Sequence, residues 1–250
     1  MTEIWSSGGG MQSVAIGELI YQGLLPKPDL AVIVDTERER STTWEYLDKY
    51  TRPRLKEIGL EVHRVPKSRY AMVDLYGGKD GDTLLIPAFT NQSGEIGKMP
   101  TLCSTEWKLR VLQRWATKEH GVKKANLWMG MSTDELHRAK PGSGKWLKRY
   151  PLIELKMNRG DCVAFVLRAG LPIPARSSCW MCPNHREDEW REEKERQPQD
   201  FMRAVQFEEY IRKRDKNVWL HAECKPLDKV DFDPKNEVMF GSCDSGMCFV

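Results

Sequence analysis

The sequence contains no apolar run that approaches the roughly 20 residues needed to cross a bilayer. Its first residues also lack the basic segment and following apolar stretch of a secretory signal. Internal repeats and low-complexity segments are absent as well. We therefore expect a cytoplasmic globular protein that makes no membrane contact.

Histidine is scarce, and cysteine is odd in number. None of the five histidines stands at the spacing of a zinc finger, and seven cysteines without an export signal argue against a disulfide framework. Cysteine in such a chain indicates metal binding or thiol chemistry. Cys162, inside an apolar helical pattern, and Cys224 are interpreted as buried or incidental thiols.

The other five cysteines form the candidate metal site. Cys179 and Cys182 are separated by two residues and followed by proline, a spacing that lets two thiolates reach one metal ion or cluster. Cys103 precedes a predicted helix, whose N-terminus favours a thiolate. Two arrangements stay open. One is an iron–sulfur cluster on Cys103, Cys179 and Cys182, with an open iron or a tail ligand such as Cys243, and the other is zinc on Cys179, Cys182, Cys243 and Cys248.

The charge is small in total but unevenly distributed. The chain has 250 residues, 40% hydrophobic and 30% charged, with a formal net charge of +3. Residues 107–150 contain eleven lysines and arginines but only three acidic residues. The same range contains four tryptophans, at positions 107, 115, 128 and 146. Such a stretch attracts phosphates, although part of it is expected to be an ordinary solvated face.

Apolar periodicity predicts alternating strands and helices in the first half of the chain. Continuous apolar runs of strand length are typical of parallel strands buried on both faces, and alternation with helices predicts a doubly wound α/β sheet. The predicted strands are 3–6, 30–34, 60–65 and 125–129, and the predicted helices are 13–24, 42–59, 105–120, 158–169, 187–195 and 200–214. Residues 69–100 are predicted to form a long loop or small insertion. We expect a nucleotide-binding domain over 1–175 and a helical, cysteine-containing extension over 176–250.

Three consecutive glycines follow the first predicted strand and lead into a helix. Glycines let the backbone approach an anion, and the helix N-terminus offers N–H groups and a partial positive charge. Ser7 and Ser13 flank Gly8, Gly9 and Gly10 with hydroxyl groups. We therefore predict that residues 7–13, called the cradle below, bind phosphate, although an ordinary strand-to-helix turn can use the same residues.

At this point the residues resemble the phosphoadenylyl-sulfate (PAPS) reductase branch of the adenine nucleotide alpha-hydrolase, or PP-loop, superfamily. Residues 8–13 are similar to the S-G-G-x-D-S loop of that family, with Gln12 in place of aspartate. Residues 35–43 are similar to its D-T-G-x-E…T stretch, 130–138 to its G-x-R…R element and 150–152 to its Y-P-L segment. The resemblance covers about residues 1–215 and is nearest to members from phages and mobile elements, including those encoded beside type IV CRISPR loci.

The resemblance implies a set of site residues. The nucleotide would be bound by Ser7, Gly8, Gly9, Gly10, Gln12, Ser13, Asp35, Thr36, Gly130 and Arg138, and substrate phosphate by Lys108 and Lys140. Cys103, Cys179 and Cys182 fall where cluster-bearing members carry cysteines. Ser132 stands in place of a reductase arginine, and the tail carries Cys248 without the family's E-C-G-[IL]-H motif.

Three functions follow as hypotheses from this resemblance. The first is sulfonucleotide reduction, in which the Cys248 thiolate attacks sulfur and a thioredoxin-like reductant releases the product. The second is ATP-dependent transfer of sulfur or another group to a nucleic acid or a small molecule. The third is a non-catalytic nucleotide-binding protein that joins a larger nucleoprotein complex.

Overall fold

The computed structural model describes residues 1–232, which form two compact units. The first unit comprises Met1–Tyr70 and Arg110–Ser177, and the second comprises Ala71–Leu109 and the described residues from Ser178 onward. Cys243 and Cys248 lie outside the described residues. No helix within residues 1–232 is long and apolar enough to span a membrane.

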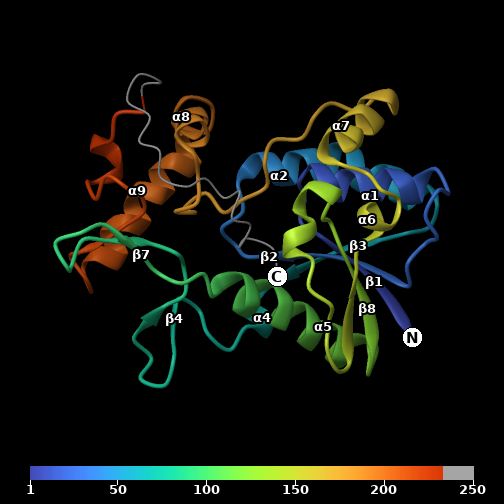
Figure 1. Cartoon of the computed structure of the whole chain (residues 1–250), viewed down its shortest axis with the longest axis horizontal. Helices are drawn as coiled ribbons and strands as arrows, with labels where there is room; N and C mark the ends of the chain where they lie inside the picture. Colours follow the sequence, from blue (N-terminus) through green and yellow to red (C-terminus); the bar gives the residue numbers. More distant parts are fainter. Residues whose placement is uncertain (233–250) are drawn as a thin grey trace. The chain divides into compact units, whose positions relative to one another are not determined.

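A parallel sheet forms the centre of the first unit (Figure 1). Its strands lie in the order β3-β2-β1-β8-β9, and every neighbouring pair is parallel. Their bounds are β1 (Thr2–Ser7), β2 (Leu30–Asp35), β3 (Val62–Pro66), β8 (Ala125–Met129) and β9 (Trp146–Arg149). This arrangement confirms the predicted α/β fold.

Helices cover both faces of this sheet, as predicted (Figure 1). α1 (Met11–Tyr21) packs against α7 (Arg159–Arg168) over a buried apolar cluster that includes Trp5 and Trp128. α5 (Arg110–His120) packs on β2 and β3 and buries Trp115. The shorter helices of this unit are α4 (Lys67–Tyr70), η3 (Thr133–Arg138) and α6 (Pro151–Glu154).

The helix predicted over 42–59 is built from three successive segments. α2 (Ser41–Tyr46) is followed by the π-helical segment η1 (Leu47–Thr51) and then by α3 (Arg52–Glu57). Pro53 lies in the first turn of α3 and has no N–H group to donate. The wider π turn that precedes it is one way to pass a proline without ending the helix.

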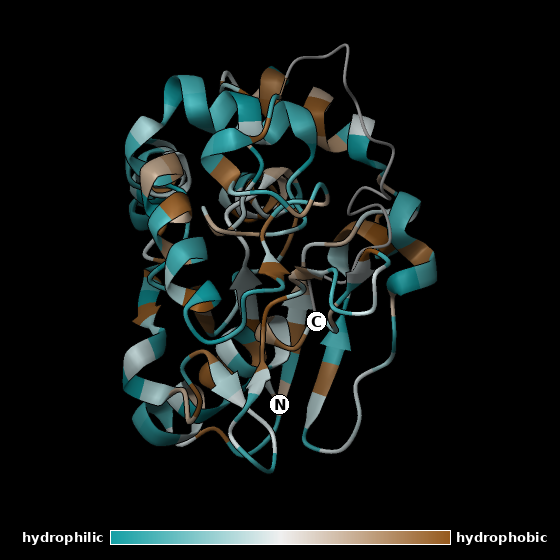
Figure 2. Cartoon of the chain, turned by 90° about the vertical axis from the view of Figure 1, so that its left-hand side faces the viewer, coloured by the Kyte–Doolittle hydropathy of each residue, from teal (hydrophilic) through white to brown (hydrophobic). Residues whose placement is uncertain are grey.

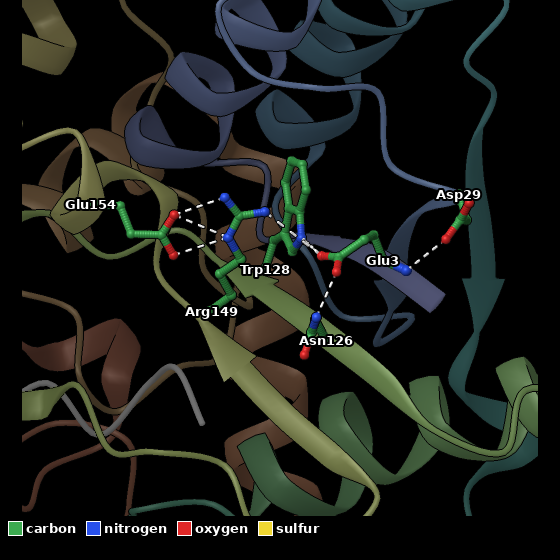
Figure 3. Close-up of polar contacts among 6 residues, drawn as sticks. All are labelled: Glu3, Asp29, Asn126, Trp128, Arg149 and Glu154. Atoms are coloured by element: carbon green, nitrogen blue, oxygen red, sulfur yellow. Dashed lines mark hydrogen bonds and ion pairs between the residues drawn. The ribbon is translucent and has the colours of Figure 1, made fainter. Parts of the chain in front are cut away.

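The fifth strand, β9, is missing from the prediction because its residues, Trp-Leu-Lys-Arg, do not form an apolar run. An edge strand tolerates charged side chains, and they discourage pairing with another chain. A polar network fixes this edge (Figure 3). Glu3 accepts hydrogen bonds from Asn126 and Trp128, and Arg149 donates to Glu154 at 2.8–3.0 Å while its guanidinium lies 5.0 Å from the Trp128 ring centroid. The network therefore links β1, β8, β9 and α6.

Among its described residues, the second unit has two α-helices, the short helical segments η2 (Ser104–Leu109) and η4 (Leu227–Lys229), and several two-residue strands. α8 (Glu187–Arg196) and α9 (Pro198–Arg212) match the predicted helices closely. Residues 69–100, predicted as a loop, contain β4 (Tyr76–Gly77), β5 (Thr83–Leu84), β6 (Phe89–Thr90) and β7 (Gly97–Lys98), and β6 also pairs with β10 (Val218–Trp219). Such short strands leave no periodic pattern in the sequence.

Hydropathy colouring shows both hydrophilic and hydrophobic residues along the helices (Figure 2). In the second unit, the hydrophobic residues of α8 and α9 include Trp190, Phe201 and Phe207, which share one buried cluster with Trp107 and Leu220. Burial of large aromatic side chains contributes roughly 1.5–3 kcal/mol each. The second unit therefore has an apolar core of its own.

Candidate functional site

The carboxyl ends of the parallel strands meet at one edge of the sheet in the first unit. The chain runs from β1 to β2 and β3 on one side, and β8 then pairs with the other side of β1. This reversal creates a topological switch point between β1 and β8, the usual position of ligands in open α/β sheets. The cradle follows β1, and Gly130 follows β8 at the same edge.

The cradle has a backbone shape that requires glycine. Gly9 has φ +74°, and a Cβ atom at this position would lie 2.6 Å from Cγ2 of Thr43. The Gly8 amide donates to Ser13 Oγ at 2.8 Å, and the Gly9 amide donates to Ser7 Oγ at 3.3 Å. Ser7 and Ser13 therefore stabilise the loop by accepting hydrogen bonds from its amides. Each hydroxyl can still donate a hydrogen bond to another acceptor.

Ser177, which the sequence analysis did not predict as a site residue, also supports the cradle. Its hydroxyl donates to the Gly8 carbonyl, and its Cβ would lie 3.5 Å from a Cβ on Gly10. It stands 169 residues from Gly8 in the sequence, so no local pattern could have identified it.

The N-terminus of α1 is open toward an anion. Gly10 is the N-cap residue, no side chain caps the helix, and its first turn contains no acidic residue. The first amides of a helix have no intrahelical acceptor, and the helix dipole adds a partial positive charge there. The 11-residue helix therefore presents unneutralised donors directly behind the glycine loop.

The element after β8 approaches the cradle closely. A Cβ at Gly130 would lie 3.1 Å from Ser13 Oγ and 3.3 Å from the Ser13 nitrogen, so only glycine fits without displacement. Gln12 donates from Nε2 to Glu135 at 2.9 Å, and Arg138 forms an ion pair with the same carboxylate. Glu135 thus joins the first turn of α1 to the predicted nucleotide-binding arginine.

Glu135 is absent from the predicted site. Its spacing of three residues from Arg138 is the pattern of an acid–base pair on one helix face, which could have indicated it. Its bond to Gln12 spans 123 residues and has no local signal.

Asp35, predicted to contact the nucleotide, shapes the turn after β2. Its carboxylate accepts from the Glu37 amide at 2.6 Å and pairs with Arg64 at 2.7 Å. Glu37 has φ +61°, so the Asp35 contact stabilises an unfavourable backbone conformation. The Arg64 guanidinium lies 3.7 Å from the Trp44 ring centroid, and the adjacent Thr36 is fully buried.

The two predicted phosphate-binding lysines belong to different units. Lys140 is exposed in the first unit, and its carbonyl accepts from the Tyr150 hydroxyl at 2.6 Å. The pKa of Lys148 is lowered by burial and by the positive charge of Lys140. An anion between these two ammonium groups would relieve their repulsion. Lys108 is half-buried on η2 in the second unit.

The three described cysteines of the predicted metal site all belong to the second unit. Cys103 and Cys179 pack against the apolar cluster of the second unit, and Cys182 follows in a turn closed by its amide on the Cys179 carbonyl at 3.0 Å. No three histidine, cysteine or acidic side chains within residues 1–232 form a group that could hold a metal ion. The iron–sulfur cluster on Cys103, Cys179 and Cys182 therefore stays a prediction. Cys243, the fourth predicted ligand, lies outside the described residues.

A hollow of about 640 Å³ lies at the opposite edge of the same sheet, where the strands begin. Its lining includes Thr2, Leu30 and Lys124, and Asp29, which also lines it, accepts from the Glu3 amide at 2.7 Å. Because it lies at the amino ends of the strands, it is separate from the cradle.

No protein-family model and no curated protein matches the sequence. Among solved structures, the chain is similar to the PAPS reductase from Candida auris in a phosphate complex, with 14% identity and a TM-score of 0.42 over 72% of this chain and 82% of that one. It is also similar to the U34-tRNA thiolase NcsA from Methanococcus maripaludis with its [4Fe-4S] cluster, with 13% identity and a TM-score of 0.43 over 71% of this chain and 58% of that one. Because both likenesses are low, we base the functional proposal on the cradle.

Proposed function

We propose that this chain is an enzyme that binds an adenine nucleotide, with the nucleotide phosphates on the cradle. The observation that carries the proposal is the uncapped N-terminus of α1, which has no acid in its first turn and lies behind a glycine loop at the switch point of a parallel sheet. Such a terminus attracts an anion through both its amides and its dipole. The adenine base is implied by the family resemblance.

Several side chains would assist the amides. The hydroxyls of Ser7 and Ser13 accept from the loop and can donate their own protons to phosphate oxygens. Arg138 has a side chain only 9% exposed and is held by Glu135, so its guanidinium has little freedom to lose on binding. A bidentate guanidinium suits phosphate.

The activity we propose is sulfonucleotide reduction. The Cys248 thiolate would attack the sulfur atom, form a cysteine S-sulfonate and release the nucleotide phosphate. A thioredoxin-like dithiol would then release sulfite and become a disulfide. The sequence position of Cys248 and the family resemblance support this step.

One observation favours a second candidate, ATP-dependent transfer to a nucleic acid or small molecule. Ser132 replaces the arginine that reductases use on the sulfonucleotide, and it is fully buried with its hydroxyl 3.2 Å from Asp134. This serine therefore offers no donor to a sulfate group. A nucleotide-binding protein without chemistry is the remaining alternative.

Gly10→Asp tests the cradle without damaging the fold. Gly10 has φ −89° and ψ −176°, an ordinary N-cap conformation in which aspartate is among the preferred residues. The new carboxylate would cap α1 and repel phosphate, so we expect unchanged or higher thermal stability and at least tenfold weaker ATP binding by calorimetry. Gly10→Asn caps with similar shape and no charge and should retain more binding. Equal ATP affinity in the Asp variant and the parent would refute the cradle.

Sulfite release from adenylyl sulfate and from PAPS, with thioredoxin present, tests the activity. We expect release by the parent protein and none by Cys248→Ser, with ATP binding intact in both. No release by a parent protein that binds ATP would reject reduction and leave transfer or a silent binding role.

A further inference from the structure

Five lysines lie along the β9 edge of the sheet and in the turn that leads into β8. They are Lys123, Lys124, Lys140, Lys145 and Lys148; the first four are exposed, and Lys148 is half-buried. None of the five forms an ion pair with another residue of 1–232. These lysines belong to the basic stretch 107–150, and their positive charge is therefore available to a ligand.

The backbone brings these lysines together. The Ala125 amide donates to the Lys145 carbonyl at 2.9 Å, which places Lys124 beside Lys145 at the start of neighbouring strands about 5 Å apart. The loop before β9 folds back along the strand, because a Cβ at Gly142 would lie 2.4 Å from the Lys148 nitrogen. The five lysines, together with Trp146, are called the β9 patch below.

The acidic side chains near this edge are engaged elsewhere. Glu3 accepts two hydrogen bonds in the network of Figure 3, and Glu154 is held by Arg149. Successive side chains of a strand point to opposite faces, so Arg149 and Lys148 lie on different faces of the sheet. The carboxylates therefore do not neutralise the patch. Burial, and then the charge of Lys140, lower the pKa of Lys148, which is the effect of a cation crowded by another cation.

Trp146 provides an aromatic surface between the lysines of the patch. It is half-buried, and its indole makes no ring or cation contact in the part of the chain that the structure describes. Trp128 and Trp190, by contrast, are fully buried in apolar clusters. An accessible indole flanked by cations is suited to stacking with an unpaired base. Leu147 is the single aliphatic residue of β9, which is too little apolar surface for a lipid bilayer.

We infer that the β9 patch binds single-stranded nucleic acid, with its lysines on the phosphates and one base stacked on Trp146. Each contact between an ammonium group and a phosphate releases a counterion, so the binding constant falls as the salt concentration rises. At about 0.7 per phosphate of a single strand, five contacts predict a slope of about −3.5 for log K against log salt concentration. The inference rests on these side chains and does not require a nucleotide on the cradle.

Fluorescence anisotropy of a labelled oligothymidylate of about 12 nucleotides, titrated with the full chain over a range of salt concentrations, tests this inference. We expect binding at low salt with a slope near the predicted value. Lys124→Gln/Lys145→Gln should weaken binding about tenfold or more at low salt and make the slope shallower by about 1.4. Lys213→Gln/Lys216→Gln removes the same charge from two exposed positions of the second unit and should change neither quantity.

Trp146→Ala separates stacking from charge. We expect affinity to fall about fivefold or more with the salt slope unchanged, and Trp146→Phe to retain more of the affinity. Gly10→Asp should still bind the oligonucleotide, so a failure of the cradle and a failure of the β9 patch are distinguishable.

Three results would overturn the inference. The first is no binding of the oligonucleotide by the parent protein at low salt, including the case in which it binds anionic lipid vesicles instead. The second is an equal loss of affinity in the two double-lysine variants. The third is equal affinity for duplex and single strand with no effect of Trp146→Ala, because a patch that reads only charge would behave in that way.

Discussion

Gly9→Ala applies a defined perturbation to the cradle. The added methyl group would meet Cγ2 of Thr43 at 2.6 Å, a separation that real Cβ atoms do not adopt. The substitution also places an L-residue at φ +74°, in the left-handed region. Both effects act on the loop that we expect to bind phosphate.

The two effects can be given separate magnitudes. A non-glycine residue in the left-handed region costs about 1–2 kcal/mol. An extra methyl group in a packed region costs about 1–3 kcal/mol. We therefore expect Gly9→Ala to lower the free energy of unfolding by about 2–5 kcal/mol. Each kcal/mol lowers Tm by about 2–4 °C in a chain of this size.

Gly23→Ala is the matched control. Gly23 has φ +72°, almost the same as Gly9, but no atom lies within 4 Å of a Cβ at that position. It should therefore show the backbone cost alone, about 1–2 kcal/mol. Chemical denaturation of both variants, with calorimetry of ATP binding, separates the steric effect from the backbone effect. ATP affinity should fall in Gly9→Ala and stay unchanged in Gly23→Ala.

A rescue experiment makes the reasoning refutable. Thr43→Ser removes Cγ2 and keeps the hydroxyl, so the Gly9→Ala/Thr43→Ser double variant should recover at least 1 kcal/mol relative to additivity. If Gly9→Ala costs no more than Gly23→Ala, or if Thr43→Ser gives no recovery, the described contact between these two residues is not what requires glycine at this position.

Three further outcomes follow from the first unit. Gln12→Asp should lower the free energy of unfolding by about 1–4 kcal/mol, because the new carboxylate would lie about 4 Å from that of Glu135 and repel it. Adding Glu135→Gln to this variant should restore most of the loss, as chemical denaturation would show. Burial raises the pKa of Cys162 to about 11. Native Cys162 should thus resist iodoacetamide at pH 8 and react once unfolded in urea, as peptide mass spectrometry would show. Burial likewise raises the pKa of Tyr46 to about 12. The protonated Tyr46 hydroxyl therefore contributes its full stabilisation below pH 10, and this contribution is lost as the pH rises toward 12. Tyr46→Phe leaves the Pro172 carbonyl without its donor at 2.7 Å and should lower the free energy of unfolding by about 1 kcal/mol at pH 7.

The parts of the fold that were predictable have strong local patterns. The apolar run 30–34 became the buried strand β2, and the glycines after residue 7 lie at the turn from β1 to α1. Burial on both faces forces parallel strands to be continuously apolar, so their sequence is recognisable without knowledge of neighbours. β9 lies at the edge of the sheet, where that constraint is weaker. Its two basic residues interrupt the apolar pattern, so the strand was not predicted.

The parts that were not predictable depend on contacts between distant residues. Ser177 reaches Gly8 across 169 residues, and residues 71–109 join a unit whose other residues begin at 178. Neither association has a spacing or composition that sequence could reveal.

Gln12 shows how one long-range contact changes the meaning of a sequence difference. In the sequence, Gln12 is a departure from the aspartate of the loop that residues 8–13 resemble. In the structure its amide donates to the Glu135 carboxylate, a bond that an ionised aspartate could not make. Glu135 also holds Arg138, so a carboxylate at position 12 would repel the group that positions the arginine. The glutamine is therefore consistent with a working phosphate site in which the acidic group is supplied from the element after β8.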